Sequence, residues 1–196
     1  MASPLVAAVA TGDGGLFLTG DGGQDWQRMS ARRGAAVTTL ELSHDALVAG
    51  RADGSVVLAA RSEEGWTGRT VVVSKQPIRD AHITNSRWLM VVDEGGDIWR
   101  STDSGETWQE QTPPDAGAPV REIIGGVLGV KVVRADGTID RLVEHTDHLA
   151  IESLGSDLPA PPPGIDVADA VGTGQGVLVR TTDGQLLHQP IEEWFT

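Results

Sequence analysis

The chain has 196 residues, of which 39% are hydrophobic and 22% charged, and its formal net charge is −13. This size and composition are typical of a globular protein of one domain or two small ones. The absence of cysteine excludes a disulfide scaffold, a thiol nucleophile and a thiolate metal site, and the acidic charge argues against nucleic acid or an anionic membrane as a partner.

The first fifteen residues carry no basic segment, and their apolar run is too short for a signal peptide or a membrane span. We therefore expect a soluble protein, either cytoplasmic or associated with a particle. Glycine is abundant, with 25 residues, and no segment keeps helical periodicity over three turns. The expected elements are strands and turns.

An internal repeat organises the chain. Glycines that follow apolar or β-branched runs recur at intervals of 40 to 47 residues, and each has an apolar residue two positions after it and another seven positions before it. These turn glycines are Gly14, Gly54, Gly96, Gly137 and Gly184. Asp-Gly and Gly-Gly pairs are typical of hairpin turns, so the pattern predicts one hairpin around each glycine.

Four repeats contain a further apolar segment upstream of the hairpin, in residues 35–42, 77–83, 119–124 and 164–171, and the first repeat contains none. Four strands in a period of about 40 residues are typical of a β-propeller blade. The chain is therefore predicted to be all-β, a small five-bladed β-propeller with four-stranded antiparallel blades, the first lacking its inner strand. A β-sandwich or a β-solenoid is the alternative.

The predicted domain covers residues 1–196. Its repeats are 1–33, 34–75, 76–116, 117–158 and 164–196, with a proline-rich connector at 155–164. The last residues, 190–196, include Trp194 and Phe195, and we expect them to dock against the first repeat and close the ring.

Two octets share the pattern S/T-x-D-x-G-x-x-W, one at 19–26 and the other at 101–108. The pattern resembles the Asp-box, or bacterial neuraminidase repeat, which is found in sialidases and photosystem II assembly factors. The resemblance implies a propeller fold and a structural turn, in which the carboxylate caps backbone N–H groups, the glycine has a positive φ and the tryptophan packs over the hairpin. The predicted turn residues are Thr19, Asp21, Gly23, Trp26, Ser101, Asp103, Gly105 and Trp108.

Sialidase-like catalysis uses a tyrosine nucleophile, and the chain has no tyrosine. No carboxylate pair stands out from turn and surface roles. We therefore expect no enzyme activity, no catalytic residue, no cofactor and no metal.

Two groups of residues are considered as metal ligands. His145 and His148 in the segment 144–148 could ligate zinc or nickel, but a polar hairpin tip is the favoured interpretation. Asp13 and Asp21 could bind calcium, but the sequence around them lacks a dense loop of oxygen ligands.

The predicted function is that of a non-catalytic binding or structural module for protein–protein interaction or assembly. An assembly factor and a structural or adhesion component of a phage-like particle both fit this prediction. The alternative is a carbohydrate-binding propeller with Trp88, Trp99 and Asn85 as candidate sugar contacts, because sugars bind exposed aromatic rings beside polar acceptors. A glycoside hydrolase ranks below both.

Overall fold

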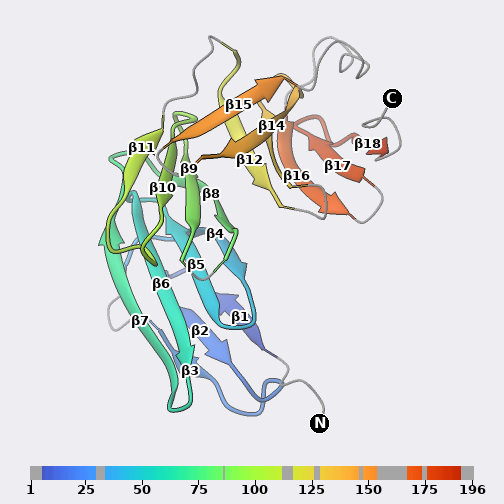
Figure 1. Ribbon diagram of the computed structural model, residues 1–196. Helices are drawn as coiled ribbons and strands as arrows, with labels where there is room; N and C mark the ends of the chain where they lie inside the picture. The colour runs from blue at the N-terminus through green and yellow to red at the C-terminus, as the bar shows by residue number, and fades with distance from the viewer. Residues whose placement is uncertain are drawn as a thin grey trace. The chain divides into compact units, whose positions relative to one another are not determined.

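The computed structural model describes residues 6–29, 34–85, 87–111, 117–125, 129–145, 148–153, 167–173 and 176–190. The regular elements in these ranges are strands, which agrees with the all-β prediction (Figure 1). The described residues include no helix that is long and apolar enough to cross a membrane. The connector at 155–164 and the segment 191–196, with its predicted role in ring closure, lie outside the described residues.

The strands form five sheets in chain order. Sheet 1 contains β1 (Ala7–Ala10), β2 (Leu16–Thr19) and β3 (Gln27–Arg28). Sheet 2 contains β4 (Val37–Leu42), β5 (Ala46–Arg51), β6 (Ser55–Ser62) and β7 (Gly65–Val72), and sheet 3 contains β8 (Ile78–Ile83), β9 (Leu89–Asp93), β10 (Ile98–Ser101) and β11 (Gln109–Gln111). Sheet 4 contains β12 (Val120–Ile124), β13 (Val130–Arg134), β14 (Ile139–Glu144) and β15 (Leu149–Ser153), and sheet 5 contains β16 (Val167–Thr173), β17 (Gly176–Thr181) and β18 (Leu186–Pro190).

Sheets 2, 3 and 4 therefore have four strands each, whereas the described residues give sheets 1 and 5 three strands each. In sheet 1 the strand before the first hairpin, β1, lies at the edge of the sheet. Its counterparts β5, β9, β13 and β17 each have an additional strand on that side. Within the described residues, sheet 1 thus lacks the inner strand that the other sheets possess.

The five turn glycines fix the hairpins. All five have a positive φ, between 78° and 89°, which an L-residue with a side chain adopts only at a cost. Gly54 has a second constraint, because a Cβ there would lie 2.1 Å from the carbonyl oxygen of Ser74.

A β-bulge occurs at the same place in each inner strand. The register shifts between Val37 and Thr39, and the equivalent shift occurs in β8, β12 and β16. A bulge inserts one extra residue and increases the local twist of the strand. Because the bulge recurs at the same position, sheets 2 to 5 share this backbone geometry even where their side chains differ.

The core lies between consecutive sheets. One cluster joins sheets 1 and 2 through Leu16, Leu18, Leu47 and Trp66 among others. A second joins sheets 2 and 3, and a third joins sheets 4 and 5. Because side chains alternate along a strand, sheet 2 presents one face to sheet 1 and the other face to sheet 3.

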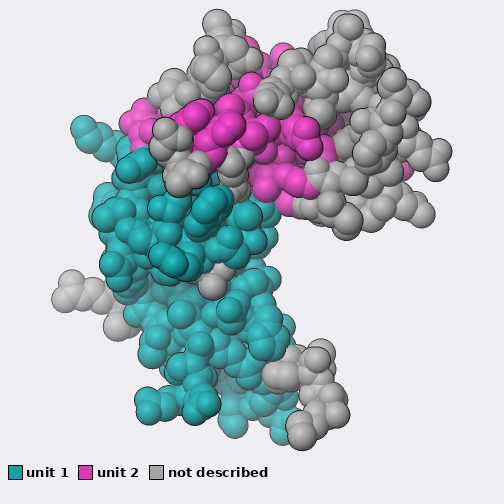
Figure 2. Space-filling view, in the orientation of Figure 1, with its two compact units in different colours: residues 1–94, 99–109 teal, residues 95–98, 110–196 magenta. Residues whose placement is uncertain are grey.

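The chain divides into two compact units, residues 1–94 with 99–109 and residues 95–98 with 110–196 (Figure 2). The first contains sheets 1 and 2, and the second contains sheets 4 and 5. The single-domain organisation over 1–196 stays a prediction.

Candidate functional site

The first octet forms the turn between β2 and β3. The Thr19 hydroxyl donates to the Asp21 carboxylate at 2.7 Å and accepts from the Gly23 N–H at 3.0 Å. The carboxylate also accepts from the N–H groups of Gln24 and Asp25 at 3.0 and 3.1 Å. The Trp26 indole N–H donates to the Gly23 carbonyl at 3.2 Å.

The second octet repeats this network between β10 and β11. Ser101 donates to Asp103 at 2.8 Å and accepts from the Gly105 N–H at 2.8 Å, while Asp103 accepts from the N–H and hydroxyl of Thr107 at 2.9 and 2.6 Å. The Trp108 indole N–H donates to the Gly105 carbonyl at 3.2 Å. A threonine or serine thus fills the same role in both turns.

Two consecutive residues of each octet have a positive φ. They are Gly22 and Gly23 in the first octet, and Ser104 and Gly105 in the second. Gly105 is also constrained by packing, since a Cβ there would lie 2.2 Å from a methyl carbon of Leu58. The second octet therefore rests directly against sheet 2.

The octet tryptophans differ in burial. Trp108 is half-buried and packs against the cluster between sheets 2 and 3, whereas Trp26 is 43% exposed. Both rings donate to the glycine carbonyl of their own turn, and the packing of the tryptophans over the hairpins stays a prediction. The greater exposure of Trp26 has a physical reason, because sheet 1 has no described sheet before it to cover that ring.

The hydrogen bonds to the octet carboxylates also change their acidity. Donation from the Thr107 side chain and backbone lowers the pKa of Asp103 from 3.8 to about 2. Donation from Thr19 and the Asp25 backbone lowers the pKa of Asp21 as well. A carboxylate held in its charged form by several donors is poorly suited to proton transfer near neutral pH.

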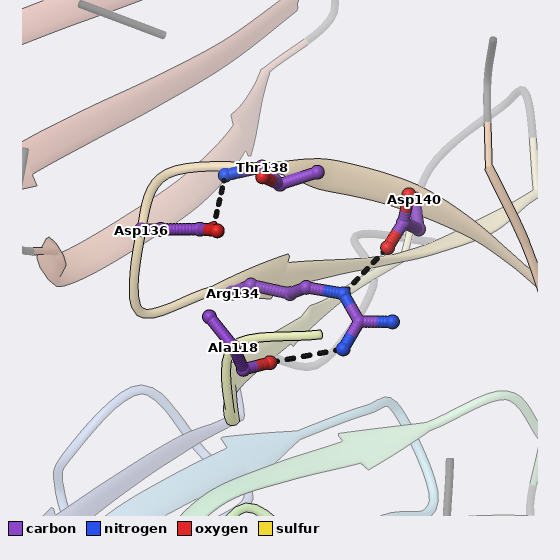
Figure 3. Close-up of polar contacts among 5 residues, drawn as sticks. All are labelled: Ala118, Arg134, Asp136, Thr138 and Asp140. Atoms are coloured by element: carbon purple, nitrogen blue, oxygen red, sulfur yellow. Dashed lines mark hydrogen bonds and ion pairs between the residues drawn. The ribbon is translucent and has the colours of Figure 1, made fainter. Parts of the chain in front are cut away.

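A buried ion pair between Arg134 of β13 and Asp140 of β14 joins the two strands of the hairpin in sheet 4, and we call it the clasp of sheet 4 (Figure 3). Arg134 Nε donates to Asp140 at 2.6 Å, and Arg134 Nη1 donates to the Ala118 carbonyl at 2.9 Å. Both charged side chains are at least nine-tenths buried, so each depends on the other for compensation. In the turn itself, Asp136 accepts from the Thr138 N–H at 3.0 Å (Figure 3).

The equivalent positions of sheet 3 carry a different buried polar group. There Asp93 accepts from the Ser74 hydroxyl at 2.7 Å and from the Trp99 indole N–H at 3.2 Å. In sheet 2 the position three residues before the turn glycine is Arg51, whose Nε has no hydrogen-bond partner in the described structure. Val57 of sheet 2 lies three residues after its turn glycine, which is the position that Asp140 occupies in sheet 4. Sequence reasoning missed this clasp, although the repeated tetrad Arg-Ala-Asp-Gly at 51–54 and 134–137 was a visible signal.

Glutamine side chains connect consecutive sheets. The Gln27 amide donates to the Trp66 carbonyl at 2.8 Å and accepts from the Trp66 N–H at 3.3 Å. In the second unit, Gln111 accepts from the Leu149 N–H at 3.1 Å. Trp66 and Leu149 occupy the octet tryptophan position of repeats that have lost the rest of the motif.

The three candidate sugar contacts are engaged within the protein. Asn85 Oδ1 accepts from the Arg87 and Trp88 N–H groups at 3.0 Å each. The Trp88 ring lies 4.9 Å from the Arg100 guanidinium, and Trp99 packs against the core while donating to Asp93. These contacts give the three residues structural partners, and no interaction joins Trp88 to Trp99 among those of the described residues.

The structure also gives the positions of the candidate metal ligands. His145 and His148 close the tip between β14 and β15 through a backbone hydrogen bond of 2.9 Å, and their rings stack at 4.4 Å. Asp13 and Asp21 lie in turns at opposite ends of β2, so the structure does not bring them together. Across the described ranges no group of three or more acidic, histidine or cysteine residues forms a metal-binding cluster. Asp147 lies outside these ranges.

One groove lies on the first unit, with a volume of about 490 Å³. Its floor includes the buried side chains of Leu58 and Leu89, and Arg61, Arg69 and Asp45 supply its charged groups. Arg69 also donates to the Ser104 carbonyl at 3.0 Å, which ties the groove to the second octet. An apolar floor with a few convergent polar groups is the usual form of a binding site.

No protein-family model matches the chain, and no curated protein sequence does. Three of the solved structures that are similar to the chain illustrate the likeness. One is YCF48 bound to D1 peptide, with a TM-score of 0.56 and 15% identity, and the match covers 93% of this chain and 63% of that chain. Another is YCF48 from Cyanidioschyzon merolae, with a TM-score of 0.60, 12% identity and coverage of 95% of this chain and 69% of that chain. The third is selenomethionine-substituted virginiamycin B lyase from Staphylococcus aureus, with a TM-score of 0.55, 13% identity and coverage of 96% of this chain and 70% of that chain.

The matching structures are β-propeller proteins. The fold is of the β-propeller kind. At these identities the likeness shows the fold alone, and the chain spans 63% of the length of the peptide-bound YCF48. The Asp-box resemblance and the number of blades stay predictions.

Proposed function

We propose that this chain is a non-catalytic, five-bladed β-propeller module that binds a protein partner. The observation that carries the proposal is the groove on the first unit, which combines an apolar floor with the guanidinium groups of Arg61 and Arg69. The Arg69 side chain is exposed, so its guanidinium can donate to a carboxylate or carbonyl of a bound peptide in addition to the Ser104 carbonyl.

The likeness to YCF48 supports a protein ligand. One of the similar structures is of YCF48 bound to a D1 peptide, so a propeller of this kind holds a peptide in that case. An assembly factor is one setting for the present chain, and a structural or adhesion component of a phage-like particle is another. Both are proposals about context, because the fold does not specify the partner.

The octets are assigned a structural role within this proposal. Asp21 and Asp103 each accept hydrogen bonds from their own turn, which leaves little capacity for a ligand. The buried carboxylates Asp93 and Asp140 are likewise occupied by neighbouring donors. These engagements support a binding module over a hydrolase.

The test uses a peptide array probed with the purified chain. We expect binding of peptides that combine an apolar residue with an acidic one, and we expect the exposed groove substitution Ala60→Trp to weaken that binding at least tenfold by filling the groove. Val72→Trp is the matched control, because Val72 is 80% exposed on the same sheet and does not line the groove.

Melting temperatures of both variants are compared with the parent chain to establish that they fold. Equal peptide binding by the parent chain and Ala60→Trp would show that the groove is not the binding site. Binding of glycans in place of peptides would favour the carbohydrate-binding alternative.

A further inference from the structure

Strand β7 forms a long and regular edge of sheet 2 (Figure 1). It has eight residues, whereas the edge strands β3 and β11 have two and three. Its register with β6 is continuous from Gly65 to Val72, and it contains no proline and one charged residue, Arg69. Edge strands are usually short, bulged or highly charged, which prevents another chain from pairing with them. In β7 a single charge is the only one of these protections.

Alternate residues of β7 direct their backbone polar groups away from β6. Trp66 shows which residues these are, because its N–H and its carbonyl both bond to the side chain of Gln27 on β3, outside sheet 2. Since the direction alternates along a strand, the N–H and carbonyl groups of Gly68 and Thr70 point the same way. Both residues are exposed, and Gly68 has no side chain that could shield its backbone.

The contact with Gln27 shows what kind of group this edge accepts. The Gln27 carboxamide donates to the Trp66 carbonyl at 2.8 Å and accepts from the Trp66 N–H at 3.3 Å. A residue of a neighbouring antiparallel strand would make the same two hydrogen bonds. A peptide backbone offers this donor and acceptor again at every second residue, which is the spacing of Gly68 and Thr70. An extended peptide is therefore the chemical complement of the edge.

The groove of the first unit lies on sheet 2 beside the same part of β7. Its lining includes two rows of cross-strand neighbours, one of Ala46, Ala60 and Thr67 and the other of Val48, Leu58 and Arg69. Both rows end on β7, so the side chains of a strand added at the edge would continue them. The first row consists of small side chains and leaves room for an apolar residue, whereas the guanidinium at the end of the second row favours an acidic one.

We propose that β7 binds an extended peptide of a protein partner as an added strand, with an apolar residue opposite Thr67 and an acidic residue opposite Arg69. The inference rests on the proposed function and specifies the form of its ligand. Both side chains must lie on the same face of the added strand, so one residue separates them in the peptide. The main-chain hydrogen bonds to Gly68 and Thr70 supply affinity, and the two side chains supply specificity.

The test uses fluorescent octapeptides of serine and threonine that carry one leucine and one glutamate, with binding to the full chain measured by fluorescence anisotropy. Peptides in which one residue separates the leucine from the glutamate are expected to bind at least tenfold more tightly than peptides in which the two are adjacent. N-methylation of the separating residue and N-methylation of the next residue are then compared. Binding should weaken at least tenfold in one case and stay unchanged in the other, because only alternate N–H groups face β7.

A variant of the chain tests the same hydrogen bonds from the other side. Thr70→Pro removes an N–H that points away from β6, so it should weaken binding of the spaced peptide at least tenfold without removing a hydrogen bond of the sheet. Thr70→Val is the matched control, because it keeps the N–H and should bind as the parent chain does. Melting temperatures establish that both variants fold, and the methylated peptides test the parent chain if Thr70→Pro does not fold.

Several outcomes would overturn the inference. These are a failure of every octapeptide to bind, equal binding of the spaced and adjacent peptides, and equal losses from the two methylations. Peptide binding that Ala60→Trp weakens but Thr70→Pro does not would overturn it as well, while leaving the groove as the binding site of the proposed function. If no peptide of the wider array binds the chain, the proposed function also fails.

Discussion

At the scale of single residues, the hydrogen bonds of the two octets explain why short side chains occupy their first and third positions. A serine or threonine hydroxyl both donates to the carboxylate and accepts a backbone N–H, and the carboxylate then reaches the N–H groups at the end of the turn. A longer acid would place its oxygens beyond those donors. The geometry of the turn itself therefore favours aspartate at the third position of the octet, independently of the rest of the sheet.

Replacing Asp103 with alanine should destabilise the chain. The change removes an acceptor from the Thr107 N–H and hydroxyl, which costs about 1–3 kcal/mol of the free energy of unfolding. Urea unfolding measures the loss. Glu106→Ala is the control in the same turn, since the Ser101 and Asp103 hydrogen bonds that the structure describes in this turn do not involve the Glu106 side chain, and it should change stability by less than about 0.5 kcal/mol. Equal losses in both variants would contradict the capping role of Asp103.

At the scale of the element, the hairpins of sheets 3 and 4 combine a common backbone with different buried polar groups. The backbone is set by a glycine of positive φ, whereas the side chains beside it form an ion pair in sheet 4 and a hydroxyl–carboxylate–indole set in sheet 3. A buried ion pair adds little net stability but is costly to break from one side. The clasp of sheet 4 therefore fixes how its hairpin packs more than it stabilises the sheet.

Removing one member of the clasp should be more harmful than removing both. Asp140→Ala leaves the buried Arg134 guanidinium without its carboxylate, which should cost about 3–5 kcal/mol. The double variant Arg134→Met with Asp140→Val should recover most of that loss, because sheet 2 already has valine at the position of Asp140. Chemical denaturation of both variants measures the difference. Additive losses would show that the two side chains do not act as a pair.

At the scale of the whole molecule, turn carboxylates recur along the chain and share one electrostatic property. Hydrogen bonds from nearby hydroxyl and backbone groups lower the pKa of five of them, namely Asp13, Asp21, Asp53, Asp103 and Asp183. A carboxyl whose pKa is lower in the folded state contributes stability above its unfolded pKa and loses it as pH falls through the folded pKa. The molecule as a whole should therefore be sensitive to acid.

The melting temperature should fall as pH is lowered below the ordinary carboxyl pKa of 3.8, and for Asp103 the loss should continue to about pH 2. Asp103→Asn should show a shallower fall over this range, because its amide does not titrate. Thermal unfolding between neutral pH and the acid limit gives both curves. A parent chain with the same acid dependence as the variant would contradict the assigned pKa.

Local chemistry made much of the fold predictable from the sequence. Hairpin turns depend on a few adjacent residues, so Gly54 and Gly184 could be identified as turn glycines without knowledge of their surroundings. The spacing of those turns indicated repeated sheets, and among the described residues sheet 1 has the three strands that its repeat was expected to supply.

Contacts between residues distant in sequence were decided by the tertiary structure alone. The two octets are nearly identical in sequence and in hydrogen bonding, yet Trp108 packs against the core and Trp26 is exposed, because only Trp108 has a described preceding sheet beside it. The groove likewise draws its lining from β5, β6 and β7 together with Leu89 and Ser104, which no local pattern connects. Turn geometry is encoded by neighbours in the chain, whereas burial is decided by neighbours in space.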